Sequence, residues 1–310
     1  MNKKFVPVML TPFKENGEVD YDGLTHLTEC YIKSGAQGLF ANCLSSEMFE
    51  LTEAERIRVV QHVVRTANGA VPVVATGTFE GSVNDQADFV KRIYDLGTQA
   101  VIVITGLMAD KHEGDDVFNR NVYALLEQTG TIPLGFYECP VPYKRLITPG
   151  QLKLFIDTGR VTYHKDTSLD LEQVKEKISA GTGFSFGLYD AYMVNAVESL
   201  KAGAEGLSCI QGNYFPSLLV WLCDNYDNNE LSGEVAKVMS FFVDNMELMH
   251  DVYPFSAKYC LQKQGLNIST TTRTESKAFT AGVRNHVENL YHQYQQLQKD
   301  IQLETTEYSF

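Results

Sequence analysis

Residues 132–165 read IPLGFYECPVPYKRLITPGQLKLFIDTGRVTYHK and contain two short apolar runs, one ending at Tyr137 and the other at Lys165. The two runs lie one repeat unit apart. The same alternation of a short apolar run with a longer segment of helical period continues in both directions along the chain. This repeat predicts strands that alternate with helices.

Eight apolar runs predict eight strands. They are residues 6–10, 38–41, 71–76, 100–105, 132–137, 161–165, 184–188 and 206–210. The runs are almost continuously apolar, as strands of a parallel sheet covered on both faces must be, whereas a one-sided antiparallel sheet would alternate. The chain is therefore predicted to be a (β/α)8 TIM barrel.

The pattern changes after residue 210. From about residue 231 to residue 303 the spacing of apolar residues is helical, as at Met239, Phe242 and Met246, and no convincing strand occurs. The predicted organisation is a barrel with the active site over residues 1–228, a C-terminal helical extension packed on it over residues 229–304, and a frayed tail over residues 305–310.

The composition excludes several classes of partner. A formal net charge of −13 repels phosphate backbones and anionic lipid surfaces. No apolar run approaches the roughly 18 residues of a membrane span, and the apolar stretch at residues 5–10 is too short for a secretion signal. The six cysteines lack zinc-like spacing, which favours reduced thiols. We expect a cytoplasmic protein without nucleic-acid or membrane partners.

Lys165 and Tyr137 are candidate catalytic residues because each ends a predicted strand, where the reacting groups of such barrels lie. Alone, Lys165 is interpreted as a surface or salt-bridged lysine and Tyr137 as a core tyrosine. Neighbouring parallel strands lie roughly 4.8 Å apart, so the phenol can reach the amine. Burial can lower the pKa of a catalytic lysine from about 10.4 to roughly 7 to 8. The pair therefore predicts Schiff-base chemistry with a tyrosine as proton shuttle.

Other predicted strand ends supply candidate substrate-binding residues. Ser45 and Ser46 follow the run at residues 38–41, and their hydroxyls and turn amides suit a carboxylate. An ordinary turn with a capping serine explains them equally well. Gly187 lies in the seventh expected strand, and Ile210 ends the eighth.

The sequence gives no sign of a nucleotide or metal site. The patterns GxGxxG, GxxxxGK and HExxH do not occur. His62, His112 and His164 have no evident partner at metal-ligand spacing, so we expect them to be structural or exposed. Neither a cofactor nor a metal ion is expected.

A series of segments, in order along the chain, matches a known family pattern. The segments are residues 8–13 (VMLTPF), 44–47 (LSSE) with 51–52 (LT) and 55–56 (ER), 75–78 (ATGT), 137–140 (YECP), 164–168 (HKDTS), Gly206 with Asn213, and Ala257 with Lys258. Over about residues 5–266 the chain resembles the dihydrodipicolinate synthase and N-acetylneuraminate lyase family of Schiff-base lyases.

The resemblance implies a pyruvate-type 2-oxo acid held as an imine on Lys165, with Tyr137 as the proton-transfer group. The implied substrate-binding residues are Ser45, Ser46, Thr167, Gly187 and Ile210. Among them, Ser45 and neighbouring amides would cradle the carboxylate, and Gly187 and Ile210 would form walls. Tetramers built from tight dimers are common in such proteins, so a homo-oligomer, either a dimer or a tetramer, is expected.

Four departures from the family pattern affect the expected substrate. Leu44 removes one hydroxyl of the proton relay, and residues 106–108 (GLM) replace the tyrosine pair that synthases carry after the fourth strand. Pro142 takes the place of the arginine that grips the second substrate's carboxylate, and Arg145 could substitute only in a reshaped loop. Glu138 replaces the usual asparagine.

These departures argue against condensation with aspartate semialdehyde, because losing a charged partner for a bound carboxylate is costly. We expect a cofactor-free class I lyase or aldolase that acts on a 2-oxo acid, with a sugar-derived or other hydroxylated partner. A true dihydrodipicolinate synthase that uses Arg145 is the nearest alternative. A non-catalytic barrel that binds an oxo acid as a sensor is an alternative of a different class.

Overall fold

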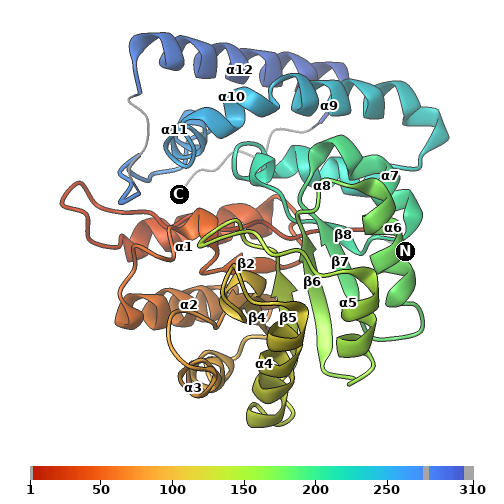
Figure 1. Ribbon diagram of the computed structural model, residues 1–310. Coiled ribbons are helices and arrows are strands. Elements are labelled where there is room, and N and C mark those ends of the chain that lie inside the picture. The colour runs from red at the N-terminus through yellow and green to blue at the C-terminus, as the bar shows by residue number, and fades with distance from the viewer. Residues whose placement is uncertain (1–2, 275–278, 304–310) are drawn as a thin grey trace. The chain divides into compact units, whose positions relative to one another are not determined.

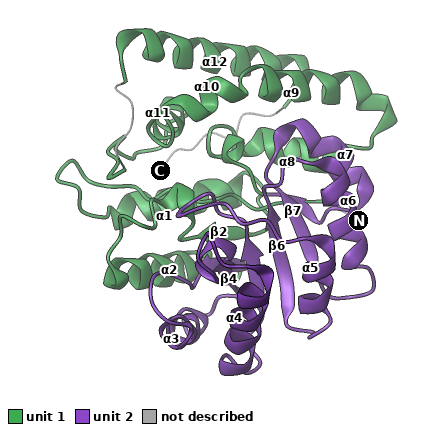
Figure 2. Ribbon diagram, viewed as in Figure 1, with its two compact units in different colours: residues 1–71, 208–310 green, residues 72–207 purple. Residues whose placement is uncertain are grey.

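The computed structural model describes residues 3–274 and 279–303 (Figure 1). The chain forms two compact units, which Figure 2 shows in different colours. The first unit comprises Met1–Val71 and Ser208–Phe310, and the second comprises Pro72–Leu207. The predicted tail at residues 305–310 lies outside the described residues.

The second unit is built on a parallel sheet whose strands follow one another in chain order. Its strands are β3 (Val73–Thr76), β4 (Ala100–Ile104), β5 (Leu134–Tyr137), β6 (Val161–Asp166), β7 (Gly187–Asp190) and β8 (Gly206–Leu207). All five residues of β4 are buried, as expected of a strand covered on both faces.

Helices alternate with these strands. They are α3 (Val83–Tyr94), α4 (Asp115–Gln128), α5 (Pro149–Ile156), α6 (Leu171–Ala180) and α7 (Ala196–Ala202), with short 3₁₀ helices η2 (Thr105–Leu107) and η3 (Met193–Asn195). Local sequence fixes where they begin. Thr148 caps α5 in a capping box with Gln151, and Pro149 opens the helix with a φ angle that suits it. Helices α5 and α6 pack on β6 and β7 respectively.

The first unit combines the two ends of the chain. Its N-terminal elements are β1 (Lys4–Phe5), α1 (Tyr21–Lys33), β2 (Leu39–Ala41), η1 (Leu44–Ser46) and α2 (Glu53–Ala67). Its C-terminal elements are η4 (Ile210–Asn213), α8 (Pro216–Asn225), η5 (Asn229–Leu231), α9 (Ser232–Asp244), α10 (Met246–Asp251), α11 (Phe255–Lys263) and α12 (Ala281–Asp300). Helix α12 packs on α9 and α11. The described residues after 228 contain no strand, as the helical spacing predicts.

A buried ion pair holds the turn after β2. Glu47 has a left-handed backbone, with φ of 56°, and its carboxylate accepts hydrogen bonds from Lys258 Nζ at 3.0 Å and from the backbone N–H of Thr274 at 2.7 Å. Burial lowers the pKa of Lys258, and the Glu47 carboxylate opposes that effect. The contact ties the turn that carries Ser45 and Ser46 to the segment after α11.

Three of the predicted strands have a limit that is wrong by at least three residues, because an apolar run does not show where ladder hydrogen bonding begins or ends. Residues 6–10 are buried, but β1 ends at Phe5 and only Val8 forms an isolated bridge, to Phe40. Strand β7 spans Gly187–Asp190 rather than residues 184–188, because Phe184 follows a left-handed Gly183 and is exposed. Strand β8 ends at Leu207, so Ile210 does not end it but opens η4.

No helix within the described ranges combines the length and the apolar character needed to cross a bilayer. All six cysteines are buried and carry free thiols.

Candidate active site

Tyr137 and Lys165 lie side by side at the carboxyl ends of adjacent strands. Tyr137 is the last residue of β5 and pairs in register with Lys165 on β6. Each side chain is almost completely buried, since both residues are only 4% exposed. Lys165 Nζ lies 4.1 Å from the centre of the Tyr137 ring. The structure therefore brings together the two side chains that strand alternation predicts to meet.

The position of the amine over the ring has a chemical consequence. The negative face of an aromatic ring favours a cation above it, while burial favours the neutral amine.

Two tyrosines line the same face of the sheet beside Lys165. Tyr163 lies two residues before Lys165 on β6, and Tyr189 pairs with Lys165 from β7. Their rings stack, with centroids 4.4 Å apart and an interplanar angle of 19°. Burial raises the pKa of Tyr189, with a further contribution from Glu205, so its hydroxyl stays protonated. Tyr189 was not predicted, because the seventh expected strand ended at residue 188, whereas β7 continues to Asp190.

Two glycines make room for this stacked pair. A Cβ on Gly135 would lie 2.7 Å from Tyr163 Cβ, and a Cβ on Gly187 would lie 2.9 Å from Glu205 Cγ and 3.3 Å from the Tyr189 ring. Such distances are too short for ordinary packing. Gly187, predicted to wall the substrate, thus lies beside the stacked rings on the face that carries Lys165.

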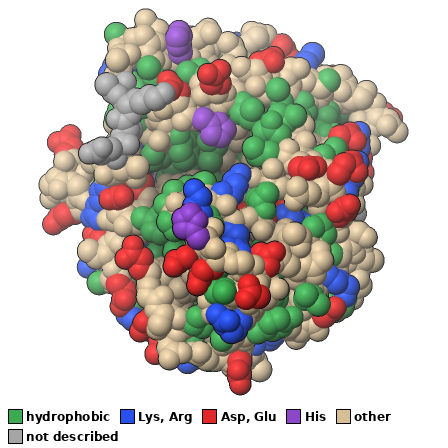
Figure 3. Space-filling model, in the orientation of Figure 1, with side chains coloured by type: hydrophobic (Ala, Val, Ile, Leu, Met, Phe, Trp, Pro, Cys, Tyr) green, Lys and Arg blue, Asp and Glu red, His purple; other side chains and the backbone are tan. Residues whose placement is uncertain are grey.

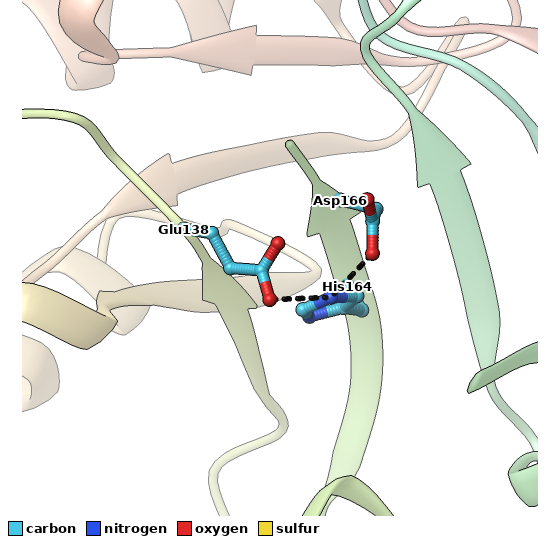
Figure 4. A group of neighbouring side chains, drawn as sticks. All are labelled: Glu138, His164 and Asp166. Carbon is cyan, nitrogen blue, oxygen red and sulfur yellow. Dashed lines mark ion pairs between the residues drawn. The ribbon is translucent and has the colours of Figure 1, made fainter. Parts of the chain in front are cut away.

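The opposite face of the same strand ends carries a buried charged cluster, Glu138, His164, Asp166 and Lys177 (Figure 4 shows the first three). Lys177 Nζ donates to Glu138 Oε1 at 2.7 Å and to Asp166 Oδ2 at 2.6 Å. His164 Nε2 lies 3.7 Å from the same Glu138 oxygen and 3.6 Å from the same Asp166 oxygen. Sequence reasoning missed this cluster.

The charges in the cluster stabilise one another. Burial opposes ionisation of Asp166, but His164 and Lys177 outweigh it and hold the pKa of that carboxyl well below its usual value. Burial likewise opposes the charge of Lys177, and Glu138 and Asp166 outweigh it and raise the pKa of the ammonium. The two carboxylates therefore favour the charged form of the buried Lys177.

Ligand atoms of Glu138, His164 and Asp166 lie within 4.8 Å of one another, and their types would suit a divalent cation. Lys177 bonds the same two carboxylate oxygens that would ligate it. A metal ion would have to displace this ammonium from the two carboxylate oxygens. The donor set therefore fits a lysine-centred ion cluster better than a metal centre.

Thr167 and Lys144 lie close to the end of β6. The Thr167 hydroxyl donates to the Glu138 carbonyl at 2.6 Å, and its backbone N–H donates to Glu138 Oε2 at 3.0 Å. Lys144 Nζ donates to the Thr167 carbonyl at 2.6 Å. The hydroxyl of Thr167, a predicted substrate ligand, is thus used in a hydrogen bond that joins the end of β6 to the segment after β5.

Arg145 is held by protein groups. Its guanidinium donates to Asp115 Oδ1 at 3.0 Å, to the Glu113 carbonyl at 3.2 Å and to the Tyr143 hydroxyl at 3.1 Å. It also lies 5.0 Å from the centre of the Phe118 ring. The loop thus directs Arg145 to the start of α4, and a substrate carboxylate would have to compete with Asp115 for it.

Ser45, Ser46 and Ile210 belong to the first unit. Ser46 Oγ donates to the Met9 carbonyl at 2.6 Å and accepts from the Cys43 N–H at 3.1 Å, so its hydroxyl closes the turn. Ser45 lies at hydrogen-bond distance from Tyr253, which burial keeps protonated by raising its pKa. Tyr253 also accepts a hydrogen bond from Asn213 Nδ2 at 2.6 Å. Tyr253 was not predicted, because it lies just before α11, far from Ser45 in the sequence, and no nearby residues indicate the contact.

Asp190 is a buried acid with a strongly shifted pKa. Burial raises its pKa from 3.8 to about 7, and the neighbouring Asp166 charge adds to the shift, against opposing contributions from the Tyr192 N–H, Ser199 and Lys177. The folded state favours the protonated form of such an acid. The stabilisation is therefore complete below the pKa of the acid in the unfolded chain, and it is lost as the pH rises through its pKa in the folded protein.

We therefore expect Asp190→Asn to gain thermal stability relative to the wild type as pH rises from about 5 to about 8. Asparagine keeps an oxygen for the Tyr192 N–H, which donates to Asp190 at 2.8 Å. Thermal melts of both proteins across this range measure the effect. A constant difference in melting temperature between the two proteins would contradict it.

The comparisons with known proteins identify the family of this chain. The model of the dihydrodipicolinate synthetase family matches residues 1–302. The chain belongs to this family. The resemblance predicted from the ordered segments is thereby confirmed, as is the prediction of a lyase-class enzyme of the class I aldolase type.

Two relatives share about a quarter of their aligned residues with this chain. The 4-hydroxy-tetrahydrodipicolinate synthase of Bacillus subtilis is 25% identical over 263 residues, covering 84% of this chain and 89% of the relative. The synthase of the same name from Ruegeria pomeroyi is 27% identical over 271 residues, covering 86% of this chain and 90% of the relative.

Solved structures of the family show the fold. A monomeric dihydrodipicolinate synthase variant superposes with a TM-score of 0.84 at 20% identity, covering 94% of this chain and 97% of its own. YagE, a family member from Escherichia coli K12 in complex with pyruvate, gives 0.82 at 20% identity, with 96% and 98% covered. CdNal from Clostridium difficile, in complex with mannosamine, gives 0.81 at 16% identity, with 94% and 99% covered. The predicted (β/α)8 fold with a C-terminal helical extension is confirmed.

Proposed function

We propose that this family member is a class I lyase that holds a pyruvate-type 2-oxo acid as an imine on Lys165. Tyr137 acts as the acid and base, and the partner that is released or added is a hydroxylated aldehyde such as a sugar-derived one. The observation that carries the proposal is the buried contact of 4.1 Å between Lys165 Nζ and the Tyr137 ring.

The chemistry follows from these two groups. The neutral amine of Lys165 attacks the ketone carbon and gives a carbinolamine, which loses water when Tyr137 donates a proton to the leaving hydroxyl. The protonated imine then takes up the electron pair of the carbon–carbon bond that breaks, and Tyr137 accepts the hydroxyl proton of the departing partner. The electron sink is the imine itself, so no cofactor forms part of the proposal.

The structure supports a partner without a second carboxylate. Arg145, the candidate replacement for the missing arginine, donates hydrogen bonds to Asp115, Glu113 and Tyr143. Acidic and basic side chains are also interspersed on the face of the molecule in Figure 3. The partner is therefore proposed to be bound through hydroxyl groups.

Borohydride reduction in the presence of pyruvate tests the imine. The peptide that contains Lys165 should gain one pyruvate, less a water, plus two hydrogen atoms, and the rest of the chain should gain nothing. No adduct at any pH near neutral would overturn the proposal and favour the sensor interpretation.

Condensation of pyruvate with aspartate semialdehyde is the second candidate, favoured by the names of the relatives at 25% and 27% identity. A coupled assay with aspartate semialdehyde decides between the two partners. Robust turnover that falls in Arg145→Ala would establish the synthase reaction and overturn the hydroxylated partner. We further propose a cytoplasmic location and a homo-oligomer, either a dimer or a tetramer.

A further inference from the structure

We propose that Lys177 is a positioning residue, whose buried ammonium holds the ends of β5 and β6 at the spacing that lets Tyr137 and Lys165 meet. This inference rests on the proposed function. It concerns the face of the sheet opposite the amine, where Lys177 from α6 contacts the two residues that directly follow Tyr137 and Lys165.

Lys177 bridges two backbone segments through their carboxylates. Glu138 Oε1 accepts from Lys177 and also from the Ile147 N–H at 2.9 Å, and Glu138 Oε2 accepts from the Thr167 N–H at 3.0 Å. The Glu138 carboxylate therefore joins the end of β5 to the segment just before α5, through Ile147, and to the end of β6, through Thr167.

Asp166 completes the bridge from the other strand. Its Oδ2 accepts from Lys177, while its Oδ1 accepts from the backbone N–H of Ser168 at 2.8 Å and from the Ser168 hydroxyl at 2.6 Å. All four charged or ionisable groups of the cluster are completely buried, so water cannot replace a missing partner. Two carboxylates left without the ammonium would repel each other in a low-dielectric interior.

Repulsion between the Glu138 and Asp166 carboxylates would displace Tyr137 and Lys165 because of the geometry of the strands. Successive residues of a strand point to opposite faces, so a movement of Glu138 or Asp166 carries the adjacent Tyr137 or Lys165 with it. A misplacement of about 1 Å at a reacting group can cost about a hundredfold in rate. Lys177 thus acts on the chemistry through position, without touching a substrate.

The test compares Lys177→Met with Lys177→Arg and with a matched control. Methionine keeps the length and removes the charge, and arginine restores the charge. Lys175→Met is the control, because Lys175 lies on the same helix but is exposed and pairs only with Glu172, at 2.7 Å. The measurements are the rate of pyruvate trapping by borohydride, kcat and KM for pyruvate turnover, and the distance from Lys165 Nζ to the Tyr137 ring in crystals.

We expect Lys177→Met to lower kcat and the trapping rate by about ten- to a hundredfold with little change in KM. Lys177→Arg should recover part of this loss, and Lys175→Met should behave as the wild type. Wild-type rates in a folded Lys177→Met protein would overturn the inference while leaving the imine intact. A wild type that traps no pyruvate would instead overturn the proposed function.

Two further measurements keep the inference testable in every case. If Lys177→Met does not fold, Glu138→Gln removes one of the two ion pairs and keeps the shape. Slower trapping in Glu138→Gln supports positioning, and a lower melting temperature with wild-type trapping overturns it. If the wild type is inactive with pyruvate, crystals of the Lys177 variant decide, since an unchanged distance of 4.1 Å between Lys165 Nζ and the ring would overturn the inference.

Discussion

Lys165→Met is expected to abolish borohydride trapping of pyruvate and to lower kcat by several orders of magnitude, because it removes the amine proposed to form the imine. Methionine fills nearly the same volume, and the site is only 4% exposed at this residue, so the fold should persist. Mass spectrometry of the trapped protein and steady-state kinetics measure the two effects.

Two further variants sharpen this prediction. Lys165→Arg retains a cation over the Tyr137 ring but has no amine that loses its proton near neutral pH, so it should be as inactive as Lys165→Met. Lys175→Met, on the exposed face of α6, should trap pyruvate as the wild type does. Trapping at another lysine in Lys165→Met would show that the nucleophile lies elsewhere.

Tyr137→Phe is expected to lower kcat by about a hundred- to a thousandfold and to slow imine formation, because the proposed phenol donates a proton in carbinolamine dehydration and accepts one when the carbon–carbon bond breaks. Phenylalanine preserves the ring over which Lys165 Nζ lies at 4.1 Å. The lysine should therefore stay in place, and the melting temperature should change little.

The matched control is Tyr123→Phe on α4, where the ring is 42% exposed and packs on Phe155. It removes a phenol without touching the site and should leave kcat unchanged. A Tyr137→Phe enzyme that turned over at the wild-type rate would exclude the phenol as the proton-transfer group. Slow trapping with an unchanged final yield would locate the loss in carbinolamine dehydration.

The pairing of Tyr137 with Lys165 could be predicted from the sequence because it depends only on local quantities. Two apolar runs predict the two strands, and their last residues lie at the carboxyl edge of the sheet. The alternation of side chains then predicts on which face of the sheet each residue lies. The structure places the pair in register on adjacent strands, as that reasoning requires.

The charged cluster could not be predicted in the same way. Lys177 reaches Glu138 from 39 residues away and Asp166 from 11 residues away, so its contacts depend on where α6 packs. A signal was nonetheless present, since alternation places Glu138 and Asp166 on the face opposite Lys165, where two buried acids require a cation. His164 was expected to be structural or exposed, and it is completely buried within this cluster.

The strand limits failed for a related reason. Apolar residues such as Val6 and Ile210 continue the pattern of a strand, while the backbone around them forms other structure. An apolar run shows only that its residues tend to be buried. Where a strand ends depends on its hydrogen bonds to a neighbouring strand, which lies elsewhere in the chain. Tyr253 shows the same limit, because its contact with Ser45 joins distant segments.

The stacked rings of Tyr163 and Tyr189 constrain how this enzyme can change its substrate range. A side chain at Gly135 or Gly187 would collide with its neighbours at 2.7 Å and 2.9 Å, so a single substitution at either glycine would disturb the packing around the two rings. New specificities must arise in the loops that follow the strands, which can vary in length without disturbing the rings. Sequence differences among related enzymes should accordingly be concentrated in these loops, while Tyr163 and Tyr189 are retained.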